Sequence, residues 1–173
     1  MLLSDDIITL RAPEPSDTDR LYIWENDPEL WPFGSATAPM SRQMLASYIE
    51  NYDADIFASR QLRFMIVVNA TGETVGTLDV TDFDPRHLHA CTGIFIEPAH
   101  RGRGVARRAL TLAAHFLAEA VTMHTLMATV AVDNMPSRRL YEACGYSTAG
   151  RLRSYIRRGH SYQDALIYQI ILK

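Results

Sequence analysis

The chain has 173 residues, of which 47% are hydrophobic, enough for one compact core and short for two. Its net charge of −3 argues against a nucleic-acid-binding protein, which would carry an excess of basic residues. No apolar run approaches the roughly 18 residues of a membrane helix, and the N-terminus lacks the basic flank of a signal peptide. We expect a single domain over residues 1–173, in the cytoplasm, with no membrane or nucleic-acid partner.

The charge is distributed unevenly along the chain. Residues 1–100 hold 6 Arg against 16 Asp and Glu, a balance of −10, whereas residues 101–173 hold 11 Lys and Arg against 4 Asp and Glu, a balance of +7. This asymmetry suits a protein that meets a cationic ligand on one side and a polyphosphate on the other. For any single residue, solvated surface charge is the alternative interpretation.

The front part of the sequence predicts one strand and two short helices. Weak alternation over residues 7–11 indicates a strand, and Ser16 is a suitable N-cap for a helix that extends through Trp24, with Leu30 as its furthest end. A second helix is expected after Ser41, because apolar side chains recur there at helical spacing.

The remainder predicts a sheet with two further helices. Two β-branched runs, 62–69 and 74–82, flank a turn and indicate an antiparallel hairpin. A strand over 90–96 precedes a helix over 105–120, whose apolar residues form one stripe. After these come a strand over 125–132, a helix from Pro136 to Cys144, and strands over 146–155 and 162–172. The order is that of a mixed α/β protein.

A basic, glycine-rich turn, RGRGVA at residues 101–106, joins the strand 90–96 to the helix 105–120. Such a turn directs several backbone N–H groups at one spot, where the helix dipole also favours negative charge, so a pyrophosphate fits there. The turn matches neither GxGxxG nor GxxxxGK[ST], which argues against dinucleotide and P-loop sites. An ordinary basic turn is the alternative.

The two cysteines, Cys91 and Cys144, lie in apolar stretches without CxxC spacing or ligand spacing with the histidines. Small buried thiols in a reducing compartment are therefore expected, and no metal site.

Two segments resemble the GCN5-related N-acetyltransferase (GNAT) family. Residues 93–106, GIFIEPAHRGRGVA, are similar to the strand and R/Q-x-x-G-x-G/A loop with which the family holds the pyrophosphate of coenzyme A. Residues 134–146, NMPSRRLYEACGY, resemble its N-x-x-S-x-x-L-Y-E-x-x-G-F/Y helix. The opening LRAPEPSDTDRLYIWEND is similar to the spermidine and ribosomal-protein acetyltransferase subgroups.

The resemblance implies an α/β (α+β) GNAT fold, with a mixed, mostly antiparallel central sheet of about seven strands flanked by about four helices. It also implies acetyl-CoA as co-substrate, no metal, and a homo-oligomer, either a dimer or a larger ring. The loop and the resemblance together give the expected coenzyme A contacts: Phe95, Ile96, Arg101, Gly102, Arg103, Gly104, Val105, Ala106 and Asn134.

Acetylation of an amine requires a base, because an alkyl ammonium has a pKa near ~10.4. Strict alternation along the predicted strand places Asp82 and Asp84 on one face and Asp79 on the other. We favour Asp82 as the base, directly or through water, with Glu25 as the alternative. Asp79, Asp84 and Glu29 are expected to attract a cationic substrate. For Asp82 and Glu25 as well, attraction of the cation without a role as base is the alternative.

Tyr141 falls on the tyrosine that protonates the departing sulfur in many GNAT members, and a role in core packing is its alternative. The resemblance further implies that backbone groups near Phe95 and Ile96 bind the thioester carbonyl. Four aromatic residues are candidates to line a pocket for an alkyl chain or a cation, or else to form core: Trp24, Trp31, Phe33 and Tyr48.

The predicted function is transfer of acetyl from acetyl-CoA to a primary amine. The first candidate acceptor is a polyamine such as spermidine or spermine, or a small diamine, because the front half is acidic. A protein N-terminal amine and an aminoglycoside-like antibiotic are the next candidates. A non-catalytic acyl-CoA-binding module is the alternative from a different functional class.

Overall fold

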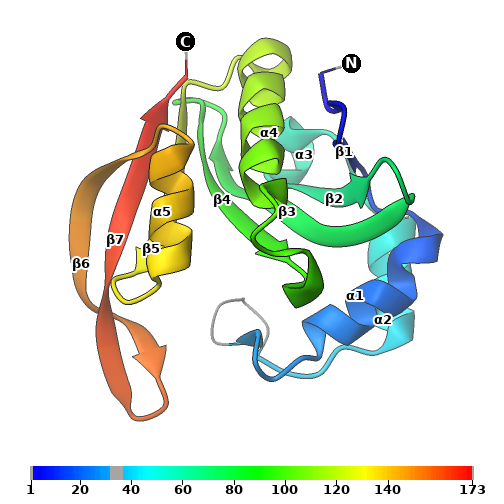
Figure 1. Cartoon of the computed structure of the whole chain (residues 1–173), viewed down its shortest axis with the longest axis horizontal. Coiled ribbons are helices and arrows are strands. Elements are labelled where there is room, and N and C mark those ends of the chain that lie inside the picture. The colour runs from blue at the N-terminus through cyan, green and yellow to red at the C-terminus, as the bar shows by residue number, and fades with distance from the viewer. Residues whose placement is uncertain (1, 32–36, 173) are drawn as a thin grey trace.

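A computed structural model, which describes residues 2–31 and 37–172, shows a seven-stranded sheet flanked by helices (Figure 1). The strand order is β1-β2-β3-β4-β5-β7-β6, and every pairing is antiparallel except that of β4 with β5. The strands are β1 (Ile8–Arg11), β2 (Leu62–Val68), β3 (Glu73–Asp84), β4 (His89–Ile96), β5 (Thr125–Ala131), β6 (Ser147–Arg158) and β7 (Ser161–Ile171).

The described residues form five α-helices and two 3-10 turns, at Pro15–Asp17 and Pro98–His100. None of the helices in this part of the chain combines the length and the apolar character needed to cross a bilayer. The helices are α1 (Thr18–Glu25), α2 (Arg42–Glu50), α3 (Ile56–Ser59), α4 (Val105–Val121) and α5 (Met135–Ala143).

Alternation along β2 divides the core between the two faces of the sheet. The ring of Phe64 packs edge to face on Phe116 of α4, with 5.9 Å between centroids. The next residue, Met65, is fully buried on the opposite face, against Leu21 of α1 and Leu45 of α2. Burying such a side chain contributes about 1.5–3 kcal/mol, so these contacts hold α4 and the α1–α2 pair on opposite faces.

The predicted start of the first helix is wrong. Ser16 lies inside the 3-10 turn, which begins after Glu14. Asp17 is 3% exposed and accepts two hydrogen bonds from Arg11, at 2.6 and 2.9 Å. Burial raises the pKa of Asp17, but the hydrogen bonds from Arg11 and from the Glu14 backbone outweigh it and hold the pKa below its ordinary value. The start of the first helix is therefore held by the ion pair between Arg11 and Asp17, and not by a serine N-cap.

The first helix also ends at Glu25, well before Leu30. The Asn26 side chain donates to the carbonyls of Tyr22 and Met40, and its Oδ1 accepts from the Met40 N–H. These bonds turn the chain toward α2, whose predicted cap is confirmed: the Ser41 hydroxyl accepts from the Met44 N–H at 3.1 Å.

A short helix, α3, raises the number of α-helices in the described residues from the expected four to five. The Asp55 side chain accepts from the Phe57 N–H, and Arg60 ends the helix with a φ of 63°. Four residues are too few for helical periodicity to appear in a sequence.

Both Cys91 and Cys144 are half-buried free thiols, and burial raises the pKa of each.

Candidate active site

The sheet opens between β4 and β5. Their parallel pairing covers only three positions and ends at Cys91 opposite Met127. Beyond it β4 pairs with β3 alone. We call the point where β4 and β5 separate the vertex; there the Thr92 hydroxyl donates to the Met127 carbonyl at 3.2 Å. The β5-facing edge of residues 92–96, which includes Phe95 and Ile96, is therefore an open strand edge that an extended ligand can enter.

The glycine turn lies beyond the end of this edge and leads into α4, as predicted. Gly102 and Gly104 have φ values of 74° and 77°, in the left-handed region, and a Cβ at either would meet no atom within 4 Å. Gly104 is the N-cap of α4 and supplies no side-chain cap. The first-turn N–H groups at residues 105–107 thus border open space at the positive end of a 17-residue helix.

The side chains around this turn have different tasks. Arg101 Nε donates to the Ile96 carbonyl at 2.8 Å and so ties the turn to the end of β4. Val105 is buried in the core and Ala106 is half-buried. Arg103 is exposed, with no ion-pair partner among the described residues, and its guanidinium is available to a phosphate.

Tyr141 reaches the vertex from α5. Asn134 caps that helix by accepting from the Ser137 N–H at 3.2 Å. The Tyr141 side chain is 4% exposed, and its hydroxyl donates to the Thr92 carbonyl at 3.1 Å. Burial raises the pKa of Tyr141 to about 12, so the phenol is protonated at any working pH.

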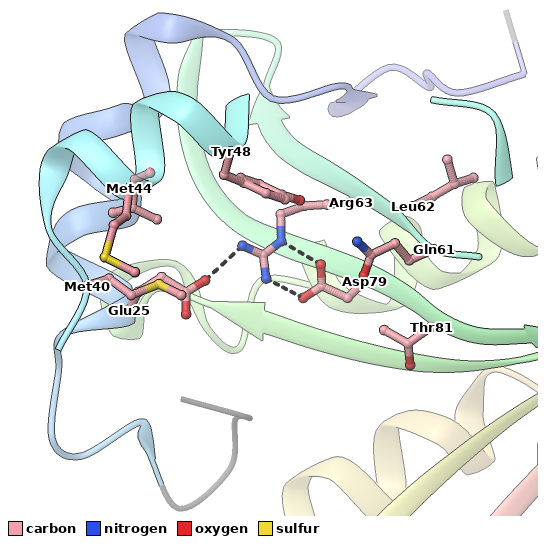
Figure 2. Close-up of a pocket in the computed structure, with 10 residues that line it drawn as sticks. Glu25, Met40, Met44, Tyr48, Gln61, Leu62, Arg63, Asp79 and Thr81 are labelled. Atoms are coloured by element: carbon pink, nitrogen blue, oxygen red, sulfur yellow. Dashed lines mark hydrogen bonds and ion pairs between the residues drawn. The ribbon is translucent and has the colours of Figure 1, made fainter. Parts of the chain in front are cut away.

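A pocket of about 370 Å³ opens on the other face of the sheet, between α1, α2 and strands β2 and β3 (Figure 2). Such a volume is typical of small-ligand sites. Its lining residues are Glu25, Met40, Met44, Leu45, Tyr48, Gln61, Leu62, Arg63, Asp79 and Thr81.

Arg63 is the central charge of this pocket. It donates to both carboxylate oxygens of Asp79, at 2.6 and 3.2 Å, and to Oε1 of Glu25 at 2.8 Å (Figure 2). Burial lowers the pKa of Arg63, and the ion pairs with Asp79 and Glu25 outweigh it and raise the pKa above its ordinary value. The Tyr48 ring lies 5.7 Å from the guanidinium, and burial raises the pKa of Tyr48 to about 12. One cation between two carboxylates leaves the group with a formal charge of −1.

The predicted carboxylates are therefore separated by the fold. Glu25 and Asp79 line the pocket, whereas Asp82, Asp84 and Glu29 do not. Asp84 accepts the backbone N–H groups of residues 86 and 87 and shapes the β3–β4 turn. Asp82 and Glu29 are exposed.

The predicted facing of Asp84 opposite Asp79 is wrong, because a bulge at Asp82 interrupts the strand. Thr81 pairs with Cys91 and Asp84 with His89, so three positions on β3 match two on β4. Asp82 occupies the bulge with a φ of 54°. The extra residue returns Asp84 to the face of Asp79.

The aromatic candidates also separate. Tyr48 lines the pocket, whereas Trp24 is core, with its ring 5.1 Å from that of Phe95. Trp31 donates to the Glu25 carbonyl at 2.8 Å, and Phe33 lies outside the described residues. Arg63 was not among the predicted residues. The sequence signal that could have identified Arg63 is a single arginine within an otherwise apolar strand, LRFMIVV.

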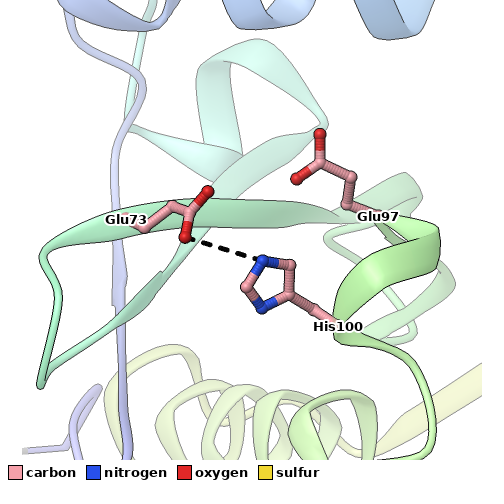
Figure 3. A group of neighbouring side chains, drawn as sticks. All are labelled: Glu73, Glu97 and His100. Atoms are coloured by element: carbon pink, nitrogen blue, oxygen red, sulfur yellow. Dashed lines mark ion pairs between the residues drawn. The ribbon is translucent and has the colours of Figure 1, made fainter.

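A second charged cluster joins the start of β3 to the glycine turn (Figure 3). His100 Nε2 lies 3.6 Å from a carboxylate oxygen of Glu73, and Glu97 approaches both residues. Arg20 of α1 lies 3.5 Å from Glu73 and 3.2 Å from Glu97, and the Trp24 indole donates to Glu97. Because the Arg20 guanidinium already pairs with both glutamates, the cluster is an ion-pair network that anchors the turn to α1.

Gly93 lies between the pocket and the open edge. It pairs with Asp79 across β3 and β4, and directly paired residues of an antiparallel sheet share a face. A Cβ at Gly93 would meet no atom within 4 Å. At position 93, therefore, no side chain of β4 stands beside Asp79 on this face of the sheet.

The chain is similar to known proteins in sequence and in fold. A family model described as an acetyltransferase (GNAT) domain matches residues 8–147. A spermidine N(1)-acetyltransferase of Vibrio cholerae serotype O1 is 27% identical over 157 residues, which cover 91% of this chain and 88% of the relative.

Solved structures agree with that match. The spermidine N-acetyltransferase from Vibrio cholerae in complex with CoA and spermine has a TM-score of 0.83 at 24% identity, covering 97% of each chain. The ribosomal-protein-S5-alanine acetyltransferase from Vibrio fischeri has a TM-score of 0.83 at 16% identity, covering 98% of this chain and 96% of the other. These likenesses confirm the predicted fold, and together with the family match they show that the chain belongs to the acetyltransferase (GNAT) domain family.

Proposed function

We propose that this protein transfers the acetyl group of acetyl-CoA to a primary amine of a polyamine or small diamine. The observation that carries the proposal is the open edge of β4: a phosphate-suited helix N-terminus lies beyond its end, and an acidic pocket lies across Gly93 from it. Such an edge separates a donor site from an acceptor site by the width of one strand.

The residues present fit coenzyme A. Gly102 and Gly104 leave room for a pyrophosphate, which the N–H groups of residues 105–107 would hold, with Arg103 adding charge. The open edge at residues 92–96 would pair with the pantetheine arm. When bound, acetyl-CoA supplies an activated acetyl group as a thioester.

Side chains of this protein act as the base and the acid of the reaction. Among the described residues Glu25 uses only Oε1, for Arg63, so its second oxygen is available to take a proton from the acceptor ammonium. Asp79 has both oxygens engaged by Arg63. We therefore place the base at Glu25 in preference to the exposed Asp82. As the amine nitrogen bonds to the acetyl carbon and the carbon–sulfur bond breaks, Tyr141 donates its proton to the sulfur. The nitrogen then releases its second proton to solvent, from which the Tyr141 phenolate regains a proton.

The polyamine assignment is supported by the pocket's formal charge of −1 and by the spermidine acetyltransferases among the relatives. Exposed ion pairs contribute about 0.2–1 kcal/mol each, so one or two additional ammonium groups would favour a polyamine by about 1.4-fold to about 30-fold. Spermidine is expected to show a higher kcat/KM than a monoamine of similar length, and added salt to narrow the gap.

The measurement is thiol release from acetyl-CoA with both amines at low and high ionic strength. The Glu25→Gln variant brings the pocket's formal charge to zero and also removes the proposed base, so turnover of both amines should fall; the readout is the ratio of their kcat/KM values, which should lose most of the preference. Acetylation of a peptide N-terminus without polyamine turnover would overturn the acceptor while leaving the acetyltransferase in place. Acetyl-CoA binding without thiol release to any amine would indicate a non-catalytic binding module.

The open space at Gly93 makes a separate prediction. Gly93→Val adds a side chain in open space on the pocket face, so the fold should tolerate it while the acceptor's path narrows. The kcat/KM for the amine is expected to fall about tenfold or more, with an unchanged stabilisation by acetyl-CoA. Steady-state kinetics and thermal shift measure the two effects, and an unchanged kcat/KM would mean that the acceptor approaches by another route.

A further inference from the structure

Tyr146 carries a buried hydroxyl without a partner. The residue lies three positions after the end of α5 and is 4% exposed. Among the described residues, only its hydroxyl oxygen and Nδ1 of His89 are buried side-chain polar atoms that lack a hydrogen bond. An unpaired buried hydroxyl costs stability, whereas phenylalanine would fill the same space without that cost. The hydroxyl is therefore a hydrogen-bond donor that no described residue uses.

The hydroxyl lies at the vertex of the open edge. The Tyr146 ring packs edge to face on Tyr141, with 5.0 Å between centroids. The Tyr141 hydroxyl bonds the Thr92 carbonyl. The Thr92 side chain is a polar neighbour of the Tyr146 phenol and lowers its pKa against the larger rise that burial causes, but its hydroxyl donates to the Met127 carbonyl and completes no hydrogen bond with Tyr146. The two phenols thus converge on Thr92, where β4 leaves β5.

We propose that Tyr146 is a binding residue for the thioester end of acetyl-CoA, with its hydroxyl held free in the protein to donate a hydrogen bond there. The proposal rests on the acetyltransferase function proposed above. Tyr141 cannot fill this role while it bonds the Thr92 carbonyl. A second donor at the vertex would hold the acyl group in place while Tyr141 is released to protonate the sulfur.

Tyr146→Phe in the full chain tests this with two readouts that do not need turnover. The melting temperature of the free protein is expected to rise by about 2–4 °C, because the unpaired hydroxyl is removed. The Kd for acetyl-CoA is expected to rise about 3–10-fold, since one hydrogen bond is lost. The Kd for the nucleotide half of coenzyme A, which lacks the pantetheine arm, should not change.

Tyr168→Phe is the matched control within the same aromatic cluster. Its hydroxyl already donates to Glu142 at 2.7 Å and accepts from Arg138 at 3.3 Å. That variant should lower the melting temperature and leave the Kd for acetyl-CoA as in the wild type.

Three outcomes with Tyr146→Phe would overturn the inference: no rise in the free protein's melting temperature, an unchanged Kd for acetyl-CoA, or equal weakening of both ligands. A wild-type protein that binds neither ligand would instead contradict the proposed function.

Discussion

Replacing Gly104 with valine is expected to abolish the rise in melting temperature that acetyl-CoA gives the wild-type protein. Gly104 has a φ of 77°, which a β-branched residue adopts only under strain. The new side chain would occupy the open space in front of the first-turn N–H groups of α4. Because a ligand that binds only the folded state stabilises it by mass action, loss of the site removes the shift.

The same substitution at Gly72 separates lost binding from backbone strain. Gly72 also has a positive φ, 69°, and open space where a Cβ would lie, but it belongs to the turn between β2 and β3. Both variants should lose about 1–2 kcal/mol of stability in the free protein. Only Gly72→Val should keep the full acetyl-CoA shift in differential scanning fluorimetry. A full shift in Gly104→Val would remove the glycine turn from the cofactor site.

Tyr141→Phe is expected to lower turnover about 10²-fold or more while leaving acetyl-CoA binding nearly intact. The variant removes only the acidic hydroxyl and keeps the ring that packs against Tyr146 and Tyr168. It also leaves the Thr92 carbonyl without its donor, so the free protein should lose about 1–3 kcal/mol. Steady-state turnover with the best amine and a thermal shift with acetyl-CoA distinguish the two effects.

The pH dependence gives this prediction a second test. Burial raises the pKa of Tyr141 to about 12 in the folded protein, above its value of about 10 in the unfolded chain. The associated stability is therefore complete below pH ~10 and is lost as the pH rises toward 12. In the wild type, ionisation of Tyr141 should therefore cause no decline in rate below about pH 11. Turnover of Tyr141→Phe within twofold of wild type would make the residue structural.

Much of the fold and of the donor site could be predicted from local sequence. Hydrophobic periodicity located β2, β4 and α4 to within a few residues, because each pattern reflects the burial of one face. The positive φ at Gly102 and Gly104 is likewise a local property that glycine permits. The helix that carries Tyr141 lies where Pro136 and Gly145 indicate its two ends.

Only the tertiary structure decided which charges meet. Arg63 comes 38 residues after Glu25 and 16 before Asp79, and no local pattern pairs three charges from a helix and two strands. One bulged residue at Asp82 was enough to reverse the expected facing of Asp84, because side-chain direction along a strand depends on an unbroken alternation.

The same distinction applies at the vertex. The sequence by itself determined that a glycine turn precedes an amphipathic helix and that tyrosines follow it, since these features depend on neighbours in the chain. The three-position pairing of β4 with β5, the hydrogen bond from Thr92 to Met127 and that from Tyr141 to Thr92 arise from contacts across at least 35 residues. Such contacts depend on how the sheet and helices pack, so only the folded chain reveals them.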